Sequence, residues 1–305
     1  MKISRRTFLK DAGILLAASG LDPIFLPRFA DALEEMATGQ APLLWLQGQS
    51  CSGCSVSLLN SESPGPAELI TRYLSLYFHQ TLSAATGPSA LDAIESAINS
   101  GDYILAVEGA VPLGMKNACK IGHESFYDLL NRAAQQAKAV VSIGTCSAFG
   151  GIPAAPPNLT GAASVEQAFK EAGINPPLIH LPGCPAHPAW IVGTVVQVLK
   201  TGIPELDEFR RPKAYYHHLL HEQCPFFAQY QKKHFAKTLG EEGCLFKLGC
   251  QGVVTQADCS LRGWNGGASW CIRGRSVCVG CTRPEFARDP YFSFFRLNEE
   301  DDFSV

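Results

Sequence analysis

The 305-residue sequence lacks several features that would each point to a different class of protein. It has no excess of basic residues, because 25 Lys and Arg stand against 28 Asp and Glu, for a net charge of −3. Without a basic block, nucleic acid is not an expected partner. After the N-terminal region no stretch reaches the roughly 18 continuous apolar residues of a membrane span. We therefore expect no membrane anchor in this chain.

Cysteine is too scarce for a disulfide scaffold. The 12 cysteines make up about 4% of the chain, below the roughly 8–10% that marks such scaffolds. Disulfides remain an alternative if the protein is exported unfolded. Zinc is a second alternative, because C-x-x-C pairs bind both zinc and iron–sulfur clusters. Zinc ribbons usually place two such pairs close together, whereas the pairs Cys51/Cys54 and Cys278/Cys281 lie far apart.

The cysteines that are present form a pattern with one histidine. A dense block contains eight soft ligands: His221, Cys224, Cys244, Cys250, Cys259, Cys271, Cys278 and Cys281. Four more are spread over the first half of the chain: Cys51, Cys54, Cys146 and Cys184. A four-iron cubane takes one side-chain ligand per iron, normally cysteine and occasionally histidine. Eleven cysteines and His221 make three sets of four ligands, and only Cys119 is left without a set. The sequence therefore predicts three iron–sulfur clusters.

The N-terminus reads as an export signal. Residues 4–10, with Arg5 and Arg6, match the twin-arginine pattern, and a modestly apolar run follows to Phe29. Glycine and proline interrupt this run, which makes it a poor membrane span, and residues 30–32 form an A-x-A cleavage motif. We interpret residues 1–32 as a twin-arginine signal peptide and expect a periplasmic protein.

Residues 42–200 alternate short apolar runs with amphipathic segments. This alternation predicts an α/β domain with a parallel sheet. We expect strands at 43–46, 103–107, 139–143 and 178–181, and helices at 67–76, 91–98, 125–137, 165–172 and 190–199.

The four dispersed cysteines follow the predicted strands. Cys51 and Cys54 come after the first strand, Cys146 after the strand ending at 143, and Cys184 after the strand ending at 181. Open α/β sheets bind their ligands at the carboxyl ends of the strands, and the flanking glycines allow close backbone approach. Glu108 should share this edge, either as a proton relay or partner contact or as a structural carboxylate.

Two other residues have simpler interpretations. His187 follows Cys184 closely but has no vacant ligand position to fill, so we interpret it as structural. Cys119 is expected to act as a small buried hydrophobe. After about residue 201 the alternation gives way to aromatics, glycines and the ligand block. Residues 201–305 should form a smaller, irregular domain that two clusters hold together.

Many motifs carry a resemblance to a known family. They are the stretch from Trp45 to Leu59, Gly144-Thr145-Cys146, Pro182-Gly183-Cys184-Pro185, His221-Glu222-Gln223-Cys224-Pro225, Leu248-Gly249-Cys250 and Trp264-Asn265-Gly266-Gly267. Over essentially its whole length the chain resembles the small subunit of nickel–iron hydrogenases. The resemblance implies a flavodoxin-like domain with a proximal cluster, followed by a domain with medial and distal clusters.

The resemblance also implies the ligand sets. The proximal ligands would be Cys51, Cys54, Cys146 and Cys184, and the distal ones His221, Cys224, Cys244 and Cys250. The medial ligands would be Cys259, Cys278 and Cys281, joined by Cys271, which stands where the commonest members have proline. A fourth thiolate implies three [4Fe-4S] clusters; the medial cluster would be [3Fe-4S] if Cys271 is not a ligand. Cys271 and Gln49 favour the nickel–iron–selenium branch.

By this resemblance the chain is the electron-transfer subunit of a heterodimeric hydrogenase and holds no catalytic residue itself. The large subunit would cleave H2, and the expected acceptor is a lysine-rich multihaem cytochrome c. Glu222, Glu241 and Glu242 form a candidate acidic docking patch, and the complex could associate with a membrane through another subunit. One alternative is a free-standing ferredoxin-like carrier. Another is the cluster subunit of respiratory complex I or energy-converting hydrogenases, which lacks both the signal and the C-terminal ligand block.

Overall fold

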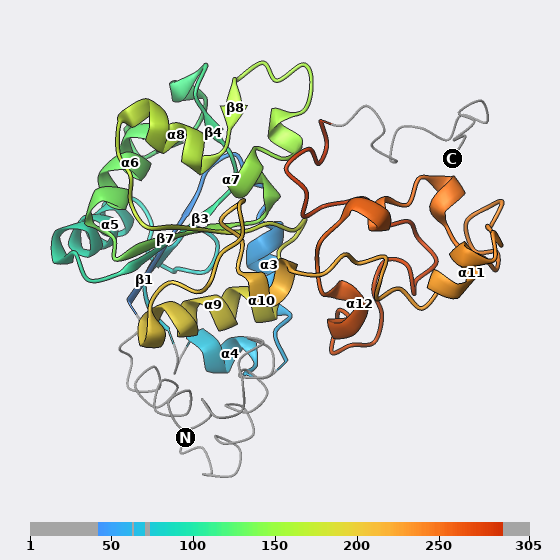
Figure 1. Ribbon diagram of the computed structural model, residues 1–305. Coiled ribbons are helices and arrows are strands. Elements are labelled where there is room, and N and C mark those ends of the chain that lie inside the picture. The colour runs from blue at the N-terminus through green and yellow to red at the C-terminus, as the bar shows by residue number, and fades with distance from the viewer. Residues whose placement is uncertain (1–41, 63, 71–73, 289–305) are drawn as a thin grey trace, which may run out of the picture.

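The computed structural model describes residues 42–62, 64–70 and 74–288 and divides into two lobes (Figure 1). The expected signal peptide, residues 1–32, lies outside the described residues. The larger lobe is built on five parallel strands: β1 (Pro42–Gln47), β2 (Ser75–His79), β3 (Ile104–Glu108), β7 (Ala139–Ile143) and β9 (Leu178–Leu181). Their order, β2-β1-β3-β7-β9, is the flavodoxin-like order 2-1-3-4-5. The predicted α/β class is therefore confirmed.

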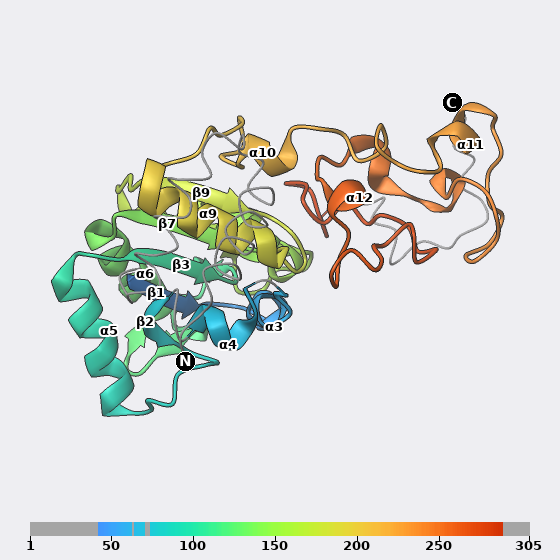
Figure 2. The same cartoon turned by 90° about the horizontal axis from the view of Figure 1, so that it is seen from below.

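Helices cover both faces of this sheet (Figure 2). Strand β1 divides its side chains by alternation: Leu43 and Trp45 belong to one apolar core, Leu44 and Leu46 to the other. The first core is closed by α3 (Gly53–Leu59) and α9 (Pro188–Thr201), and the second by α5 (Pro88–Ser100), α6 (Phe126–Gln136) and α8 (Val165–Ala172). All five strands end at one edge, which the C-terminal lobe adjoins.

One predicted helix was wrong in extent. The expected helix at 67–76 begins as α4 (Pro66–Glu68) and continues as a π-helical turn at 69–70, but β2 already begins at Ser75; residues 71–73 lie outside the described residues. The apolar residues after Leu69 fit either period, and pairing beside β1 selects the extended conformation for Ser75–His79. The other predicted elements are present, with ends shifted by three residues or fewer.

Shorter elements complete the larger lobe. The strand pairs are β4 (Val111–Pro112) with β8 (Ala162–Ala163) and β5 (Lys120–Ile121) with β6 (Glu124–Ser125). The helical turns are α7 (Thr145–Phe149), η3 (Lys116–Ala118) and η4 (Ile152–Ala154).

The smaller lobe has little regular structure. Its elements are α11 (Phe227–Gln231), α12 (Cys259–Arg262), η5 (Phe246–Leu248) and η6 (Gln251–Val254), while α10 (Lys213–Tyr216), just before it, packs Tyr215 and Tyr216 into the first core of the larger lobe. Its apolar core contains few buried side chains, among them Leu220, Leu245, Trp270 and Ile272, and the thiol of Cys278 belongs to it. Such a core supplies limited stabilisation by itself.

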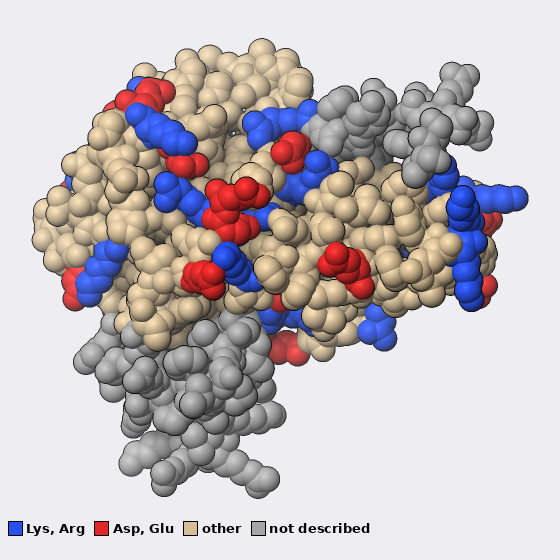
Figure 3. Space-filling view, in the orientation of Figure 1, with Lys and Arg blue, Asp and Glu red and all other residues tan. Residues whose placement is uncertain are grey.

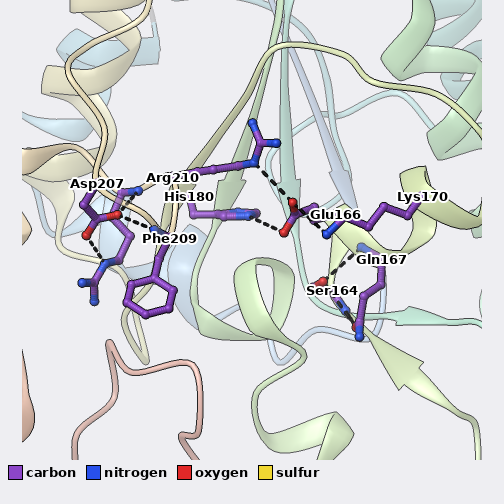
Figure 4. A network of polar contacts seen from close by, with 9 residues as sticks. Ser164, Glu166, Gln167, Lys170, His180, Asp207, Phe209 and Arg210 are labelled. Carbon is purple, nitrogen blue, oxygen red and sulfur yellow. Dashed lines mark hydrogen bonds and ion pairs between the residues drawn. The ribbon is translucent and has the colours of Figure 1, made fainter.

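A polar network fastens the segment between the lobes to the sheet (Figure 4). The backbone N–H of His180, in edge strand β9, donates to the carbonyl oxygen of Arg210 at 2.9 Å. The carboxylate of Glu166 lies 3.3 Å from Arg210 Nε and 3.1 Å from Lys170 Nζ. Beyond it, the buried guanidinium of Arg211 donates to Asp207 Oδ2 at 2.7 Å and to the carbonyl oxygen of Thr282 at 3.3 Å. The C-terminal lobe is thereby held against the larger one.

Candidate metal centres

The first candidate centre lies where the loops after β1, β7 and β9 meet. Cys51 and Cys54 flank the start of α3, Cys146 lies in α7, and Cys184 follows β9. The thiols are close enough to interact electrostatically: the charges of Cys146 and Cys184 act on Cys54, and that of Cys51 acts on Cys184. The structure therefore brings together all four dispersed cysteines.

Three of these four thiols have pKa values raised above that of a free cysteine. Burial, followed by neighbouring negative charge, raises the pKa of Cys54 well above its usual value and that of Cys146 to about 12. Burial likewise raises the pKa of Cys184. Thiolates in such a site require compensating positive charge, which bound metal supplies.

Glycines leave the room that these thiols occupy. Gly144 has φ 86°, and a Cβ at this position would lie 2.5 Å from the Sγ of Cys54. A Cβ on Gly151 would lie 3.0 Å from Cys146 Sγ. Backbone N–H groups approach the sulfurs in turn: Ala186 donates to Cys54 Sγ at 3.5 Å. The site thus presents sulfur and close backbone amides, which suits an iron–sulfur cluster.

Glu108 lies behind this centre and is only 2% exposed. Its Oε1 accepts from the backbone N–H of Cys54 at 3.0 Å. Its Oε2 accepts from Trp45 Nε1 at 3.2 Å, from Gln47 Nε2 at 3.0 Å and from the hydroxyl of Ser55. Both oxygens are satisfied, which favours the structural interpretation: Glu108 fixes the backbone at Cys54.

The second candidate centre lies in the smaller lobe, around an enclosed apolar pocket. His221, Cys224, Cys244 and Cys250 all line it. The His221 ring packs against Phe227 and Tyr230, with centroid distances of 5.1 and 4.5 Å. The buried Nε2 of His221 has no hydrogen-bond partner, an arrangement that is costly unless a ligand binds there.

The three thiols of this second centre share one local setting. The backbone N–H two residues further on lowers the pKa of each thiol, that of Phe226 for Cys224, that of Phe246 for Cys244 and that of Gly252 for Cys250. Burial raises the pKa of all three, that of Cys224 to about 11. A ring nitrogen without a partner beside three such thiols fits a cluster with one histidine ligand.

The third candidate centre lies between the other two. The charges of Cys278 and Cys271 act on Cys259, and those of Cys259 and Cys271 act on Cys281. Burial is the main cause that raises the pKa of all four thiols. Cys271 is thus gathered with the other three, although its residue is exposed at the surface.

Direct contacts connect the three centres in a row. The hydroxyl of Thr145, the residue before Cys146, donates to the carbonyl oxygen of Cys281, joining the first centre to the third. The backbone N–H of Gln251, the residue after Cys250, donates to the carbonyl oxygen of Cys278 at 2.7 Å, joining the third centre to the second. The order along the molecule is therefore first, third, second, from the sheet edge to the far end of the smaller lobe.

Cys119, the remaining cysteine, lies apart from the three centres, and the described residues offer neither a disulfide nor a site for a single metal ion. Cys119 packs against the core beneath α6, and burial raises its pKa. All twelve cysteines are free, which contradicts the disulfide alternative. Among the described residues no three His, Cys, Asp or Glu side chains are arranged around a single metal ion. A cubane requires a different geometry, with each donor at its own iron.

Sequence reasoning missed several residues that support these centres. Thr145 touches loops of two centres, and Ser55 and His79 extend the Glu108 network, with 3.2 Å between Ser55 Oγ and His79 Nε2. His187 was expected to be structural, and it caps α9 by accepting the N–H of Ala189 at 3.1 Å. Thr145 and Ser55 are polar residues directly beside Cys146 and Cys54 in the sequence, and this position was the signal that could have found them.

No helix in the described part of the chain is long and apolar enough to span a membrane.

Comparison with known proteins gives matches over nearly the whole chain. Residues 51–198 match the family described as NADH ubiquinone oxidoreductase, 20 Kd subunit, and residues 216–293 match the C-terminal family of the NiFe/NiFeSe hydrogenase small subunit. The chain is 38% identical to the periplasmic [NiFeSe] hydrogenase small subunit of Desulfomicrobium baculatum, over 96% of this chain and 99% of the relative. It is 36% identical to the periplasmic [NiFe] hydrogenase small subunit of Solidesulfovibrio fructosivorans, over 93% and 90%.

Solved structures agree with this likeness. The [NiFeSe] hydrogenase of Dm. baculatum matches with a TM-score of 0.79 and 39% identity, over 83% of this chain and 98% of that one. The recombinant [NiFeSe] hydrogenase of Desulfovibrio vulgaris Hildenborough matches with a TM-score of 0.80 and 38% identity, over 84% and 99%.

Proposed function

The chain belongs to the family of nickel–iron and nickel–iron–selenium hydrogenase small subunits, and from that premise we propose that it conducts electrons through three [4Fe-4S] clusters. It is a subunit of an oxidoreductase, and its family implies a large-subunit partner. The single observation that supports the proposal most is the row of three ligand groups, connected by the hydrogen bonds from Thr145 to Cys281 and from Gln251 to Cys278.

Each group has four donors for one cubane. The proximal cluster would be held by Cys51, Cys54, Cys146 and Cys184, the medial by Cys259, Cys271, Cys278 and Cys281, and the distal by His221, Cys224, Cys244 and Cys250. When bound, such clusters store and pass single electrons. The chain's own groups bind the clusters, exclude water through the apolar packing and direct N–H groups at the sulfurs.

The H2-cleaving centre belongs, in this proposal, to the large subunit. Cys51 and Cys184 are exposed on the isolated chain, and beside them lies an open pocket whose lining includes Val56, which is 53% exposed, and Trp264. A proximal cluster in this position would need another protein chain packed over it, because the apolar surface beside it would otherwise be exposed to solvent. This favours a heterodimer over a free-standing ferredoxin-like carrier.

The distal cluster is proposed as the electron outlet to a periplasmic multihaem cytochrome c. Figure 3 shows Lys and Arg gathered at the α11 end of the smaller lobe, with acidic side chains beside them. Glu222 and Glu242 are exposed there, whereas the carboxylate of Glu241 accepts the N–H groups of Lys237 and Thr238 at 3.1 and 3.2 Å. Glu222 and Glu242 are therefore the stronger candidates for contacting a lysine-rich partner.

Export and organisation complete the proposal. Relatives named periplasmic support a twin-arginine signal at 1–32 and a periplasmic location. We propose a flavodoxin-like domain over 42–200 and a cluster-binding domain over 201–305. Gln49 and Cys271 favour a selenium-containing partner centre. The complex I alternative is disfavoured, because the match to that family stops at residue 198 and a hydrogenase family covers the ligand block.

Metal analysis of the purified native complex tests the proposal. We expect about 12 irons on this subunit, with as many acid-labile sulfides, and no oxidised three-iron signal in electron paramagnetic resonance (EPR). An equimolar large subunit should copurify. A colourless, iron-free complex would refute the function, and a protein that purifies alone with full iron content would favour the free carrier.

A further inference from the structure

The hydroxyl of Thr145 lies at a junction between two of the ligand groups. Thr145 is the first residue of α7, precedes Cys146 and is 1% exposed. Its Oγ1 accepts the backbone N–H of Gly183 at 2.8 Å, and its own N–H donates to the carbonyl oxygen of Gly183 at 3.0 Å. The hydroxyl proton is donated to the carbonyl oxygen of Cys281. A hydroxyl has one proton to give, so this donor is fully committed.

These hydrogen bonds connect three segments that carry cysteines. Gly183 precedes Cys184, and Thr145 precedes Cys146. The carbonyl oxygen of Cys281 is therefore held from the proximal side by the Thr145 hydroxyl, which is bonded in turn to the backbone of Gly183. The result is a fixed separation between the loop of Cys184 and the loop of Cys281.

The next residue is held from another direction. Thr282 is buried, and its hydroxyl donates to the carbonyl oxygen of Gln256 at 2.9 Å. Its carbonyl oxygen accepts from Arg211 Nη1 at 3.3 Å. Thr282 thus offers a matched comparison: a buried threonine beside Cys281 whose hydroxyl bonds within the smaller lobe.

We propose that Thr145 is a positioning residue that sets the rate of electron transfer between the proximal and medial clusters. The inference rests on the proposed function, since it needs a cluster on each side. One electron at a time would pass, with no covalent bond or proton exchanged, from a cluster held by Cys51, Cys54, Cys146 and Cys184 to one held by Cys259, Cys271, Cys278 and Cys281. Electron tunnelling slows steeply with separation, so a small displacement of the two loops slows the step while both ligand sets stay intact.

Three substitutions separate the hydroxyl from its surroundings. Thr145→Val keeps the shape but leaves the N–H of Gly183 and the carbonyl oxygen of Cys281 buried without partners, which forces the loops to readjust. Thr145→Ala removes the same hydroxyl and leaves space for a water molecule. Thr145→Ser keeps the hydroxyl and should restore the junction.

The experiment uses the whole heterodimer and begins with its iron and sulfide content. After rapid mixing with H2 and freezing, EPR follows the proximal and medial clusters separately. In Thr145→Val we expect the proximal cluster to be reduced at the wild-type rate and the medial cluster several-fold more slowly. The magnetic splitting between the two reduced clusters should shrink. Thr145→Ser and Thr282→Val should resemble wild type in both respects.

Each outcome decides a different claim. The role of Thr145 would be overturned if the medial cluster of Thr145→Val were reduced at the wild-type rate and showed the wild-type magnetic splitting. It would also be overturned if Thr145→Ser were as slow as Thr145→Val. If Thr145→Val fails to assemble, the same comparison is made with Thr145→Ala. A wild-type complex without iron would instead refute the proposed function.

Discussion

The imidazole of His187 joins the two lobes: its Nε2–H donates to the carbonyl oxygen of Gly263 at 2.9 Å while its Nδ1 caps α9. The ring also packs against Trp264, with centroids 4.7 Å apart. Both nitrogens are used in the neutral form, and protonation of Nδ1 would remove the cap. Burial, followed by the charge of Arg262, lowers the pKa of His187 to about 4.

This pKa predicts a pH-dependent contribution to stability. Between pH 6.5, the usual pKa of histidine, and about 4, the unfolded chain takes up a proton that the folded chain does not. The stabilisation is therefore complete above pH 6.5 and is lost as pH falls through this window. His187→Asn keeps a cap acceptor without a titrating ring, so its denaturation midpoint should fall less steeply. His123→Asn, at an exposed position, should keep the wild-type slope.

The space beside Cys54 predicts a strict requirement for glycine at position 144. Gly144→Ala forces alanine into a positive φ and also places a methyl group 2.5 Å from the sulfur, so the proximal cluster should be lost. Gly173→Ala is the matched control, because Gly173 has φ 69° and a Cβ there would meet nothing within 4 Å. It should cost about 1 kcal/mol of stability and no iron. Equal iron content in both variants would contradict the prediction.

In the proposed function, Cys271 determines whether the medial cluster has four irons or three. Cys271→Ser should lower the iron content by about one per subunit and produce an oxidised three-iron EPR signal. Cys119→Ser, which changes a thiol packed against the core beneath α6, should leave both unchanged. If Cys271→Ser keeps the wild-type spectrum, Cys271 is not a ligand.

Removal of iron should affect the two lobes unequally. The smaller lobe has a core of few residues that includes Cys278, so without metal its backbone should become exposed. The sheet, with two apolar cores, should persist. Hydrogen–deuterium exchange on the chelator-treated protein should therefore show loss of protection over 216–288 and retention in β3 and β7. Uniform loss of protection would contradict this difference.

The charged surface over the distal centre predicts how the acceptor docks. Reversing Glu222 and Glu242 to lysine should weaken reduction of a lysine-rich cytochrome and flatten its salt dependence. Reversing Lys232 and Lys233 to glutamate provides the matched comparison on the same surface. If only the lysine reversals weaken the reaction, the acceptor presents acidic groups and the cytochrome assignment is wrong.

Sequence periodicity predicted most of the sheet domain because each apolar run has one clear period and one place in the sheet. Strand β2 was missed because the residues after Leu69 suit a helix or a strand, and only the neighbouring β1 selects between them. Cysteine number and spacing predicted three sets of four metal ligands, since soft ligands in sets of four have few other uses, but it was the resemblance to the family that divided them into groups. Spacing could not predict the contacts of Thr145, whose hydroxyl reaches the loop of Cys281 only in the folded chain.

The order of the ligand groups along the chain differs from their order in space. Residues of the first group end at Cys184 and those of the outermost group at Cys250, while the central group spans Cys259 to Cys281. A ribosome therefore releases both ends of the proposed relay before its middle. A chain cut short after Val254 would keep the eight donors of the first and second centres but lack the central group that lies between them.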